Sequence, residues 1–269
     1  MESAGLKGIR LVASDLDGTL LQNGAREPTP EAFELIHELH RRGVIFMPAS
    51  GRPYMSLRHL FAPIADELAY LCENGGVVMQ DDVAVVKRAM PRGLAEEIWA
   101  AVDARPDAFV FASGERVAYV LRGRGNEEFA RRVSAGNYAP FKVVDRPQDV
   151  EEDIVKLAYQ TEHDDQPRVR GELEELFGDR VDLVTSGWTW TDFIIPGADK
   201  GPALVEYGRI LGIDPSEMLA FGDNENDRGM LNAVGHPYLM EGCNPVMRGL
   251  NECVRYVPTV EEGLRRLLD

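Results

Sequence analysis

Short aliphatic runs alternate with amphipathic helical patterns at both ends of this chain, and this alternation constrains the fold more than any other feature. Residues 9–14 and 44–47 have the pattern of buried strands, and a helix begins between them at about Thr29. Near the C-terminus, a buried strand at 218–221 precedes a helix expected near 246–254. A strand, a helix and a strand with short connections form a βαβ unit, which requires a parallel sheet covered by helices. Both ends are therefore predicted to be halves of one α/β core.

The middle of the chain follows a different pattern. Its helices alternate with hairpin-like strands, such as 108–111 and 116–121. Strands with helices on one side are typical of an α+β module. We expect a discontinuous α/β core domain, residues 1–90 and 188–269, interrupted by an inserted α+β domain, residues 91–187. A single large domain with one mixed sheet is the alternative.

The charge balance limits the classes of partner. The chain has 269 residues, with 29 Lys+Arg against 45 Asp+Glu, and its formal net charge is −16. Nucleic-acid binding usually needs a basic face, so a nucleic-acid polymer is not expected as a partner. A local basic pocket for one small phosphate compound remains compatible with this charge.

The sequence also indicates a compartment. No uncharged run approaches the roughly 20 apolar residues of a membrane-spanning helix, and no signal-peptide pattern precedes the first strand. The three cysteines are far apart and lack C-x-x-C spacing, which is typical of free thiols in a reducing cytoplasm. We therefore expect a cytoplasmic protein without a membrane partner, as a monomer or a weak homodimer.

Acidic or hydroxyl side chains follow three of the predicted strands: Asp15 with Asp17, Ser50, and Asp223 with Asn226 and Asp227. In open α/β sheets, ligands bind beyond the carboxyl ends of the strands, so these side chains are expected to meet. Gathered carboxylates repel one another unless a cation lies between them, and hard oxygen ligands favour Mg²⁺. Turn formation explains any one of these clusters, but not all of them in order at strand ends.

Four ordered motifs resemble those of the haloacid dehalogenase-like (HAD) phosphohydrolases. Asp15-Leu16-Asp17-Gly18-Thr19-Leu20 resembles the first motif, D-x-D-G-T-L. Ser50-Gly51-Arg52 is similar to the second, with serine where close relatives often have threonine. Lys200-Gly201 resembles the third motif, and Gly222-Asp223-Asn224-Glu225-Asn226-Asp227 resembles the fourth, G-D-x-x-N-D. Asn74-Gly75 is similar to a family N-G pair at the edge of the active site.

The motif spacing is similar to that of one branch of the family. Only 31 positions separate Thr19 from Ser50, too few for an inserted domain, whereas 150 separate Ser50 from Lys200. An α+β insertion at the second place resembles the Cof-type (C2B) branch. This resemblance implies a Rossmann-like parallel-sheet core with an inserted α+β cap.

The resemblance also implies a role for each motif residue. Asp15 would be the nucleophile that forms an aspartyl-phosphate, and Asp17 would be the general acid and then the base. Mg²⁺ would be held by Asp15, Asp17, Asp223 and Asp227. The phosphate and the rest of the substrate would be bound by Ser50, Gly51, Lys200, Asn226, Asn74 and Arg52, although Arg52 is equally well explained by a structural ion pair.

The expected function is therefore Mg²⁺-dependent hydrolysis of a small organic phosphate monoester, of the sugar phosphate, FMN or pyridoxal phosphate type. A phosphosugar mutase similar to the phosphomannomutases would use the same aspartyl-phosphate and is one alternative. A non-catalytic phosphometabolite-binding protein is the other. The Asp15/Asp17 pair argues against it, because a pure binder does not need an acid beside a nucleophile.

Overall fold

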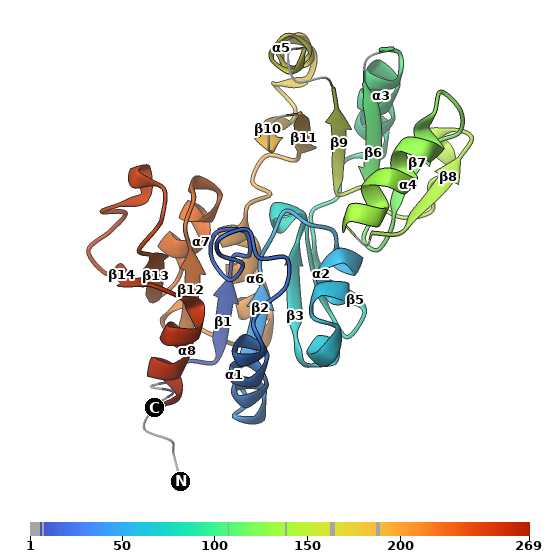
Figure 1. Cartoon of the computed structure of the whole chain (residues 1–269). Coiled ribbons are helices and arrows are strands. Elements are labelled where there is room, and N and C mark those ends of the chain that lie inside the picture. The colour runs from blue at the N-terminus through green and yellow to red at the C-terminus, as the bar shows by residue number, and fades with distance from the viewer. Residues whose placement is uncertain (1–5, 7, 107, 138, 162–164, 187–188) are drawn as a thin grey trace. The chain divides into compact units, whose positions relative to one another are not determined.

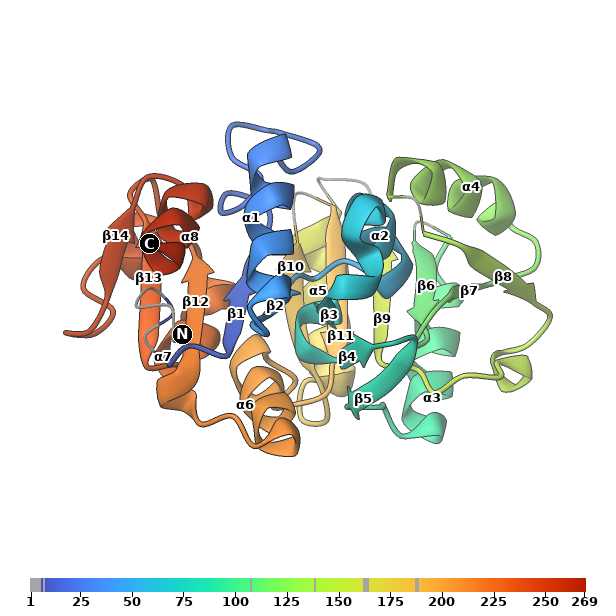
Figure 2. The same ribbon diagram turned by 90° about the horizontal axis from the view of Figure 1, so that it is seen from below.

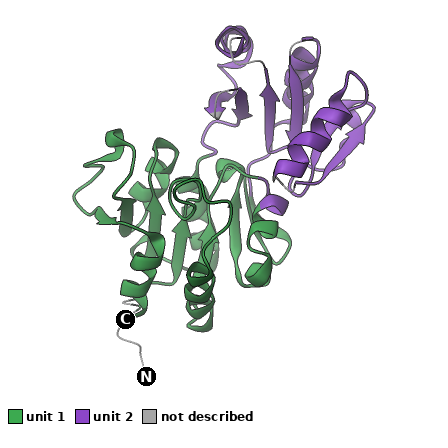
Figure 3. Ribbon diagram, in the orientation of Figure 1, with its two compact units in different colours: residues 1–52, 57–86, 199–269 green, residues 53–56, 87–198 purple. Residues whose placement is uncertain are grey.

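The structure, a computed structural model, describes residues 6, 8–106, 108–137, 139–161, 165–186 and 189–269 (Figure 1). Contacts between residues divide the chain into two compact units (Figure 3). The first, here called the core unit, comprises residues 1–52, 57–86 and 199–269. The second, here called the inserted unit, comprises residues 53–56 and 87–198.

The core unit contains a five-stranded parallel sheet in the order β14-β13-β12-β1-β2. Its central strands come from opposite ends of the chain, since Ala13 of β1 lies beside Ala220 of β12. The strands are β1 (Leu11–Ser14), β2 (Ile45–Pro48), β12 (Met218–Gly222), β13 (His236–Met240) and β14 (Arg255–Val257). The predicted parallel α/β core is confirmed.

Helices cover both faces of this sheet (Figure 2). Figure 2 shows α1 and α8 on one face, and α6 and α7 on the other. The first helix begins as its sequence predicts, because the Thr29 hydroxyl accepts a hydrogen bond from the amide of Ala32 and Pro30 occupies the first turn. The helices of the core unit are α1 (Pro30–Arg41), α6 (Lys200–Leu211), α7 (Arg228–Ala233) and α8 (Val260–Leu268). Helix α2 (Tyr54–Leu60) begins in residues assigned to the inserted unit and ends in the core unit.

A smaller sheet extends the core unit beside β2. It has the order β3-β4-β5, with β3 (Ala69–Cys72), β4 (Val77–Gln80) and β5 (Val83–Lys87). The backbone of β3 continues next to β2, where Leu71 and Ala49 form an isolated parallel bridge. The aliphatic and aromatic run at 69–71 predicts the first of these strands, whereas β4 and β5 were not expected.

The inserted unit contains a six-stranded mixed sheet in the order β10-β11-β9-β6-β7-β8, in which only the β7–β8 pair is parallel among the described pairings. Its strands are β6 (Phe109–Ser113), β7 (Ala118–Leu121), β8 (Phe141–Val144), β9 (Lys156–Gln160), β10 (Asp182–Ser186) and β11 (Trp190–Ile194). Its helices are α3 (Arg92–Asp103), α4 (Asn126–Asn137) and α5 (Gln166–Phe177). The prediction of an inserted α+β unit is confirmed.

The sequence pattern of the inserted unit suggested that its helices lie on one side of the sheet, but the structure shows helices on both sides. Trp99 of α3 and Leu173 of α5 pack into one core cluster with Val110 of β6. Phe129 of α4 packs into a second cluster with Phe111, the next residue along β6. Successive side chains of a strand point to opposite faces, so α4 covers the other face of the sheet.

Two expectations differ from the structure in detail. The inserted unit runs to Ala198, because Trp190–Ile194 pairs with β9 and β10; the expected boundary at residues 187 and 188 lies outside the described residues. The helix expected near 246–254 is wrong: a single 3-10 turn at Pro245–Met247 ends before Gly249, whose φ of 74° is left-handed.

Nowhere in the described part of the chain is a helix long and apolar enough to span a membrane.

Candidate active site

The loop after β1 is closed onto the loop after β12. Asp15 is buried at the end of β1, and Gly18 has a φ of 96° in the turn that follows. A β-carbon at Gly18 would overlap the carboxylate of Asp223, so glycine permits this close approach. The Thr19 hydroxyl donates a hydrogen bond of 2.8 Å to Asp223 Oδ1. The first and fourth motifs therefore form one cluster.

Lys200 joins two of the carboxylates in this cluster. It opens α6, is only 1% exposed, and its Nζ donates to Asp15 Oδ1 at 2.5 Å and to Asp227 Oδ1 at 2.8 Å. Burial alone would lower the pKa of Lys200, but the two carboxylates raise it above its ordinary value. Lys200 is therefore an ammonium ion at every physiological pH.

Burial has the opposite effect on Asp15. It raises the pKa of Asp15 from 3.8 to about 7, assisted by the negative charges of Asp227 and Asp223 and opposed by Lys200. Burial also raises the pKa of Asp223, against the hydrogen bond from Thr19. The cluster therefore holds more negative charge than one ammonium ion neutralises.

Asp227 organises the loop of the fourth motif. It is fully buried, and its Oδ2 accepts hydrogen bonds from the backbone amides of Asp223, at 3.0 Å, and Asn224, at 3.2 Å. Because its Oδ1 contacts Lys200, both oxygens have partners within the protein. Asn226 lies on the same turn with its side chain exposed.

Three of these carboxylates could hold a cation. Asp15, Asp223 and Asp227 each offer one oxygen, and these atoms all lie within 4.8 Å of one another. The donor set fits Mg²⁺, because it consists of hard oxygen atoms whose excess negative charge a divalent cation would neutralise. Asp17 is not a member of this group in the described structure.

The second motif forms a turn that is tied to the turn after β3. The amide of Ser50 donates to the carbonyl of Leu71 at 2.9 Å, and the carbonyl of Ser50 accepts from the amide of Asn74 at 3.0 Å. The Ser50 hydroxyl accepts from the amide of Arg52 at 3.2 Å. Gly51 lies against the Asn74 side chain, which a β-carbon at this position would overlap. The two turns therefore position each other.

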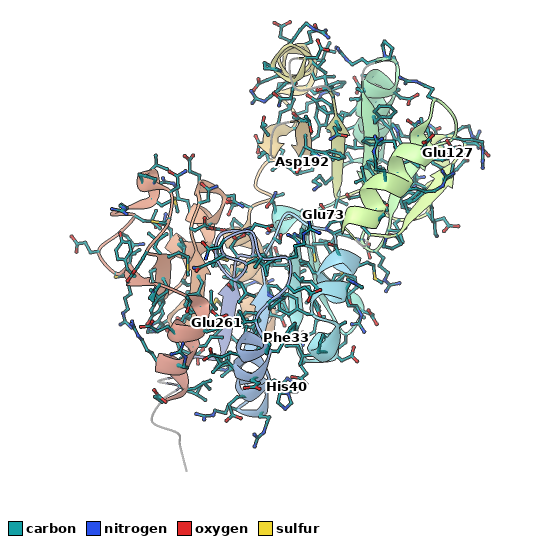
Figure 4. The ribbon with its side chains drawn as sticks, viewed as in Figure 1. Phe33, His40, Glu73, Glu127, Asp192 and Glu261 are labelled. Carbon is teal, nitrogen blue, oxygen red and sulfur yellow. The ribbon has the colours of Figure 1, made fainter. Side chains whose placement is uncertain are left out.

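The turn after β3 has an unusual backbone. Glu73 (labelled in Figure 4), Asn74 and Gly75 have φ values of 53°, 54° and 98°, all in the left-handed region. A β-carbon at Gly75 would overlap the carbonyl of Asp199, the residue before Lys200. The Asn74 Oδ1 atom is buried and has no hydrogen-bond partner in the described structure. Strained turns of this kind are frequent at functional sites.

Arg52 forms an ion pair with Asp17. Its Nη2 donates to Asp17 Oδ1 at 2.6 Å, and its Nε donates to Asp17 Oδ2 at 3.3 Å. Of the two explanations that the sequence left open for Arg52, the structure shows an ion pair.

The structure places every predicted site residue in the core unit, around the carboxyl ends of β1, β2, β3 and β12. Sequence reasoning assigned no role to Thr19 or to Asp199. The Asp199 side chain caps α6 by accepting from the amide of Gly201 at 2.8 Å. An acidic residue directly before Lys200-Gly201 is a typical N-cap pattern and could have revealed this contact.

Comparisons with known proteins define the family. A family model described as haloacid dehalogenase-like hydrolase matches residues 12–254, so the chain belongs to this family. Two curated relatives are the 5-amino-6-(5-phospho-D-ribitylamino)uracil phosphatase YbjI of Escherichia coli, strain K12, and the HMP-PP phosphatase of Citrobacter koseri. The first is 30% identical over 233 residues, 87% of this chain and 85% of the relative. The second is 27% identical over 246 residues, which are 88% of this chain and 85% of that relative.

Solved structures share the whole fold. A haloacid dehalogenase-like hydrolase from Bacteroides thetaiotaomicron superposes with a TM-score of 0.81 at 19% identity, over 96% of this chain and 99% of the other. The subclass IIB sugar phosphatase BT4131 superposes with a TM-score of 0.75 at 16% identity, over 95% of this chain and 98% of the other. Together with the family match, the curated relatives make this chain an HAD-type phosphatase, a phosphoric monoester hydrolase.

Proposed function

We propose that this phosphatase hydrolyses a small organic phosphate monoester through an aspartyl-phosphate on Asp15. The observation that carries the proposal is the position of Asp15: buried at the end of β1, paired with Lys200 at 2.5 Å, and within 4.8 Å of two further carboxylates. A carboxylate attacks a phosphate dianion well only where positive charge neutralises the phosphoryl oxygens. Lys200 supplies one such charge.

The remaining roles follow from the neighbours of Asp15. Asp17 would protonate the leaving oxygen and then take a proton from the attacking water. The phosphoryl oxygens would be bound by Ser50, Gly51, Lys200 and Asn226. Asn74, whose Oδ1 is buried without a partner, would contact the leaving group.

Mg²⁺ is the proposed cofactor. Asp15, Asp223 and Asp227 would hold it, together with Asp17 through its backbone carbonyl. Bound there, the ion would withdraw charge from the phosphoryl oxygens. Asp223 is positioned for this role by Thr19, and Asp227 by the amides of its own loop.

The substrate is proposed at the level of its class. By their names, the curated relatives act on a phosphorylated ribitylaminouracil and on HMP-PP, and BT4131 is a sugar phosphatase. These names support a small phosphorylated metabolite, of the sugar phosphate, FMN or pyridoxal phosphate type. They favour hydrolysis over the mutase reaction.

A phosphate-release screen tests this proposal. We expect the protein to hydrolyse p-nitrophenyl phosphate and at least one member of a panel of sugar phosphates, nucleotides, FMN and pyridoxal phosphate. EDTA should abolish the activity and Mg²⁺ should restore it. Asp15→Asn should lower kcat by at least about 10⁴-fold, since single nucleophile removals cost up to ~10⁶-fold, while its circular dichroism spectrum stays unchanged.

Two outcomes would contradict the proposal. Turnover retained by pure Asp15→Asn would exclude Asp15 as the nucleophile. Interconversion of hexose phosphates without release of inorganic phosphate would establish the mutase reaction instead.

A further inference from the structure

The positively charged side chains of Lys200 and Arg52 contact different carboxylates of the site. Lys200 contacts Asp15 and Asp227, which with Asp223 form the candidate cation group. In the described structure, Arg52 contacts Asp17 but none of the other three carboxylates, and it does so through both Asp17 oxygens. Asp17 therefore stands apart from the other three, although only one residue separates it from Asp15 in the chain.

The backbone of Arg52 is fixed by its neighbours. Its amide donates to the Ser50 hydroxyl at 3.2 Å, and its carbonyl accepts from the amide of Glu73 at 3.2 Å. The Arg52 side chain is 32% exposed. The guanidinium is therefore presented from a rigid turn, and a planar fork on a rigid base imposes one orientation on the carboxylate that it binds.

No side chain other than Arg52 holds the Asp17 carboxylate in the part of the chain that the structure describes. The Asp17 side chain is 64% exposed, so packing does not select its rotamer. A divalent cation in the group formed by Asp15, Asp223 and Asp227 would attract any carboxylate within reach. Without Arg52, Asp17 would be free to turn toward that cation.

We propose that Arg52 is a positioning residue. It holds the Asp17 carboxylate away from the candidate cation group of Asp15, Asp223 and Asp227, so that Asp17 can protonate the leaving oxygen. This inference rests on the proposed function. In the first step, an Asp15 oxygen bonds to phosphorus, the bond from phosphorus to the leaving oxygen breaks, and the proton of Asp17 moves to that oxygen. In the second step, the oxygen of a water molecule bonds to phosphorus, the bond from the Asp15 oxygen to phosphorus breaks, and a proton of the water moves to Asp17. Inorganic phosphate is released and both aspartates return to their starting states.

The first test compares leaving groups. p-Nitrophenolate leaves without protonation, whereas a sugar alkoxide requires it. We expect Arg52→Ala to lower kcat/KM for the best sugar phosphate of the panel by about 100-fold, the lower end of general acid contributions, and to lower kcat/KM for p-nitrophenyl phosphate less than threefold. This ratio reports the steps up to release of the leaving group, so it does not include the later attack of water, in which Asp17 acts for both substrates. Arg52→Lys should recover part of the loss.

Matched variants separate positioning from folding. Arg58→Ala removes another arginine of the core unit that pairs with a carboxylate, Asp66, and should leave both substrates unaffected. In the Asp17→Asn background, Arg52→Ala should add less than a twofold effect, because the residue that it positions has lost its function. Equal losses of kcat/KM on both substrates, or a full additional loss in the Asp17→Asn background, would overturn the proposal. If those equal losses came from a large rise in KM, they would favour a direct contact of Arg52 with phosphate instead.

Direct Mg²⁺ binding provides a readout that needs no turnover. By isothermal titration calorimetry, Arg52→Ala should bind Mg²⁺ severalfold more tightly than wild type, and most of that gain should disappear when Asp17→Asn is added. Unchanged affinity would contradict the inference about Arg52. A wild-type protein that binds Mg²⁺ but hydrolyses no phosphate ester would instead contradict the proposed function, so the two failures are distinguishable.

Discussion

At the scale of single residues, the chemistry of the site depends on how its charges are distributed. A buried ammonium ion such as Lys200 is tolerated only when it is paired, and its two partners are themselves buried. Burial, assisted by the surplus of negative charge that remains, raises the pKa of Asp15. The side chains alone leave part of this negative charge unbalanced, so the site is suited to bind an additional cation.

The raised pKa of Asp15 predicts how stability depends on pH. The folded protein binds this proton up to about pH 7, whereas an unfolded carboxyl group releases it near its ordinary value of 3.8. The resulting stabilisation is complete below about pH 4 and is lost as the pH rises through 7. In EDTA, the free energy of unfolding of wild type should fall by about 2.5 kcal/mol from pH 5 to 7.5 relative to Asp15→Asn, since each pH unit between the two pKa values contributes ~1.4 kcal/mol.

Urea denaturation at each pH measures this difference. Saturating Mg²⁺ is the control, because a cation stabilises the carboxylate form and should remove the pH dependence. Parallel pH profiles for wild type and Asp15→Asn in EDTA would show that Asp15 ionises normally in the folded protein.

Thr19 provides a second prediction at this scale. Its hydroxyl holds Asp223 Oδ1 at 2.8 Å, and residues that orient a metal ligand contribute about 10- to 100-fold to metal affinity. Thr19→Val should therefore weaken Mg²⁺ binding by at least about 10-fold, as measured by calorimetry. Thr29→Val, which removes the N-cap of α1, should lower the unfolding temperature without this loss of affinity. Equal affinities for Thr19→Val and wild type would exclude the orienting role.

At the scale of elements, α6 positions the lysine of the site. The Asp199 side chain caps the helix directly before Lys200, and the turn Glu73–Gly75 packs against the same end. Helix α6 also packs beside α7, which begins directly after Asp227. The third and fourth motifs therefore depend on the packing of two helix N-termini as well as on their own residues.

Gly75 tests this dependence. Alanine there must adopt a φ of 98° and place its β-carbon on the carbonyl of Asp199, so Gly75→Ala should destabilise the protein by about 1–3 kcal/mol. It should also lower kcat, because Lys200 follows Asp199. Gly171→Ala is the control: Gly171 lies in α5 with nothing within 4 Å of its added β-carbon, and alanine should stabilise it by about 0.5–1 kcal/mol. Urea denaturation and phosphate release measure both variants, and similar effects would refute the steric explanation.

At the scale of the whole molecule, each of the two units contains hydrophobic clusters of its own among the described residues. One cluster, with Leu231 and Met230, consists only of residues of the core unit. The clusters of the inserted unit, with Ile98 in one and Phe129 in the other, consist only of its own residues. A core mutation is therefore expected to act mainly within its own unit.

A pair of truncations checks this separation. Ile98 and Leu231 are both fully buried, so alanine at either position should cost about 2–5 kcal/mol. Leu231→Ala should also weaken Mg²⁺ binding, because α7 follows Asp227 directly. Ile98→Ala should leave Mg²⁺ affinity within twofold of wild type, as measured by calorimetry. A similar loss of affinity in both variants would show that the units are energetically coupled.

The sequence by itself determined the class of the fold and the location of the site. Short aliphatic strands alternate with helices, and this local pattern predicts a parallel sheet whose carboxyl ends gather the motif residues. The same local reasoning failed at 246–254, where Gly249 adopts a left-handed conformation and no helix forms. It also missed β4, β5, β8, β11 and β14, although their valine and aromatic residues are typical of strands.

Only the tertiary structure decided which side chains of the site contact one another. Arg52 pairs with Asp17 across 35 positions of the chain, Lys200 with Asp15 across 185, and Thr19 with Asp223 across 204. Periodicity and capping act over a few residues, whereas these contacts depend on how strands and turns pack. For the same reason, the structure decided that α4 covers the second face of the inserted sheet. The motifs name the residues of the site, and the packing of the strands and turns sets which carboxylate each cation contacts.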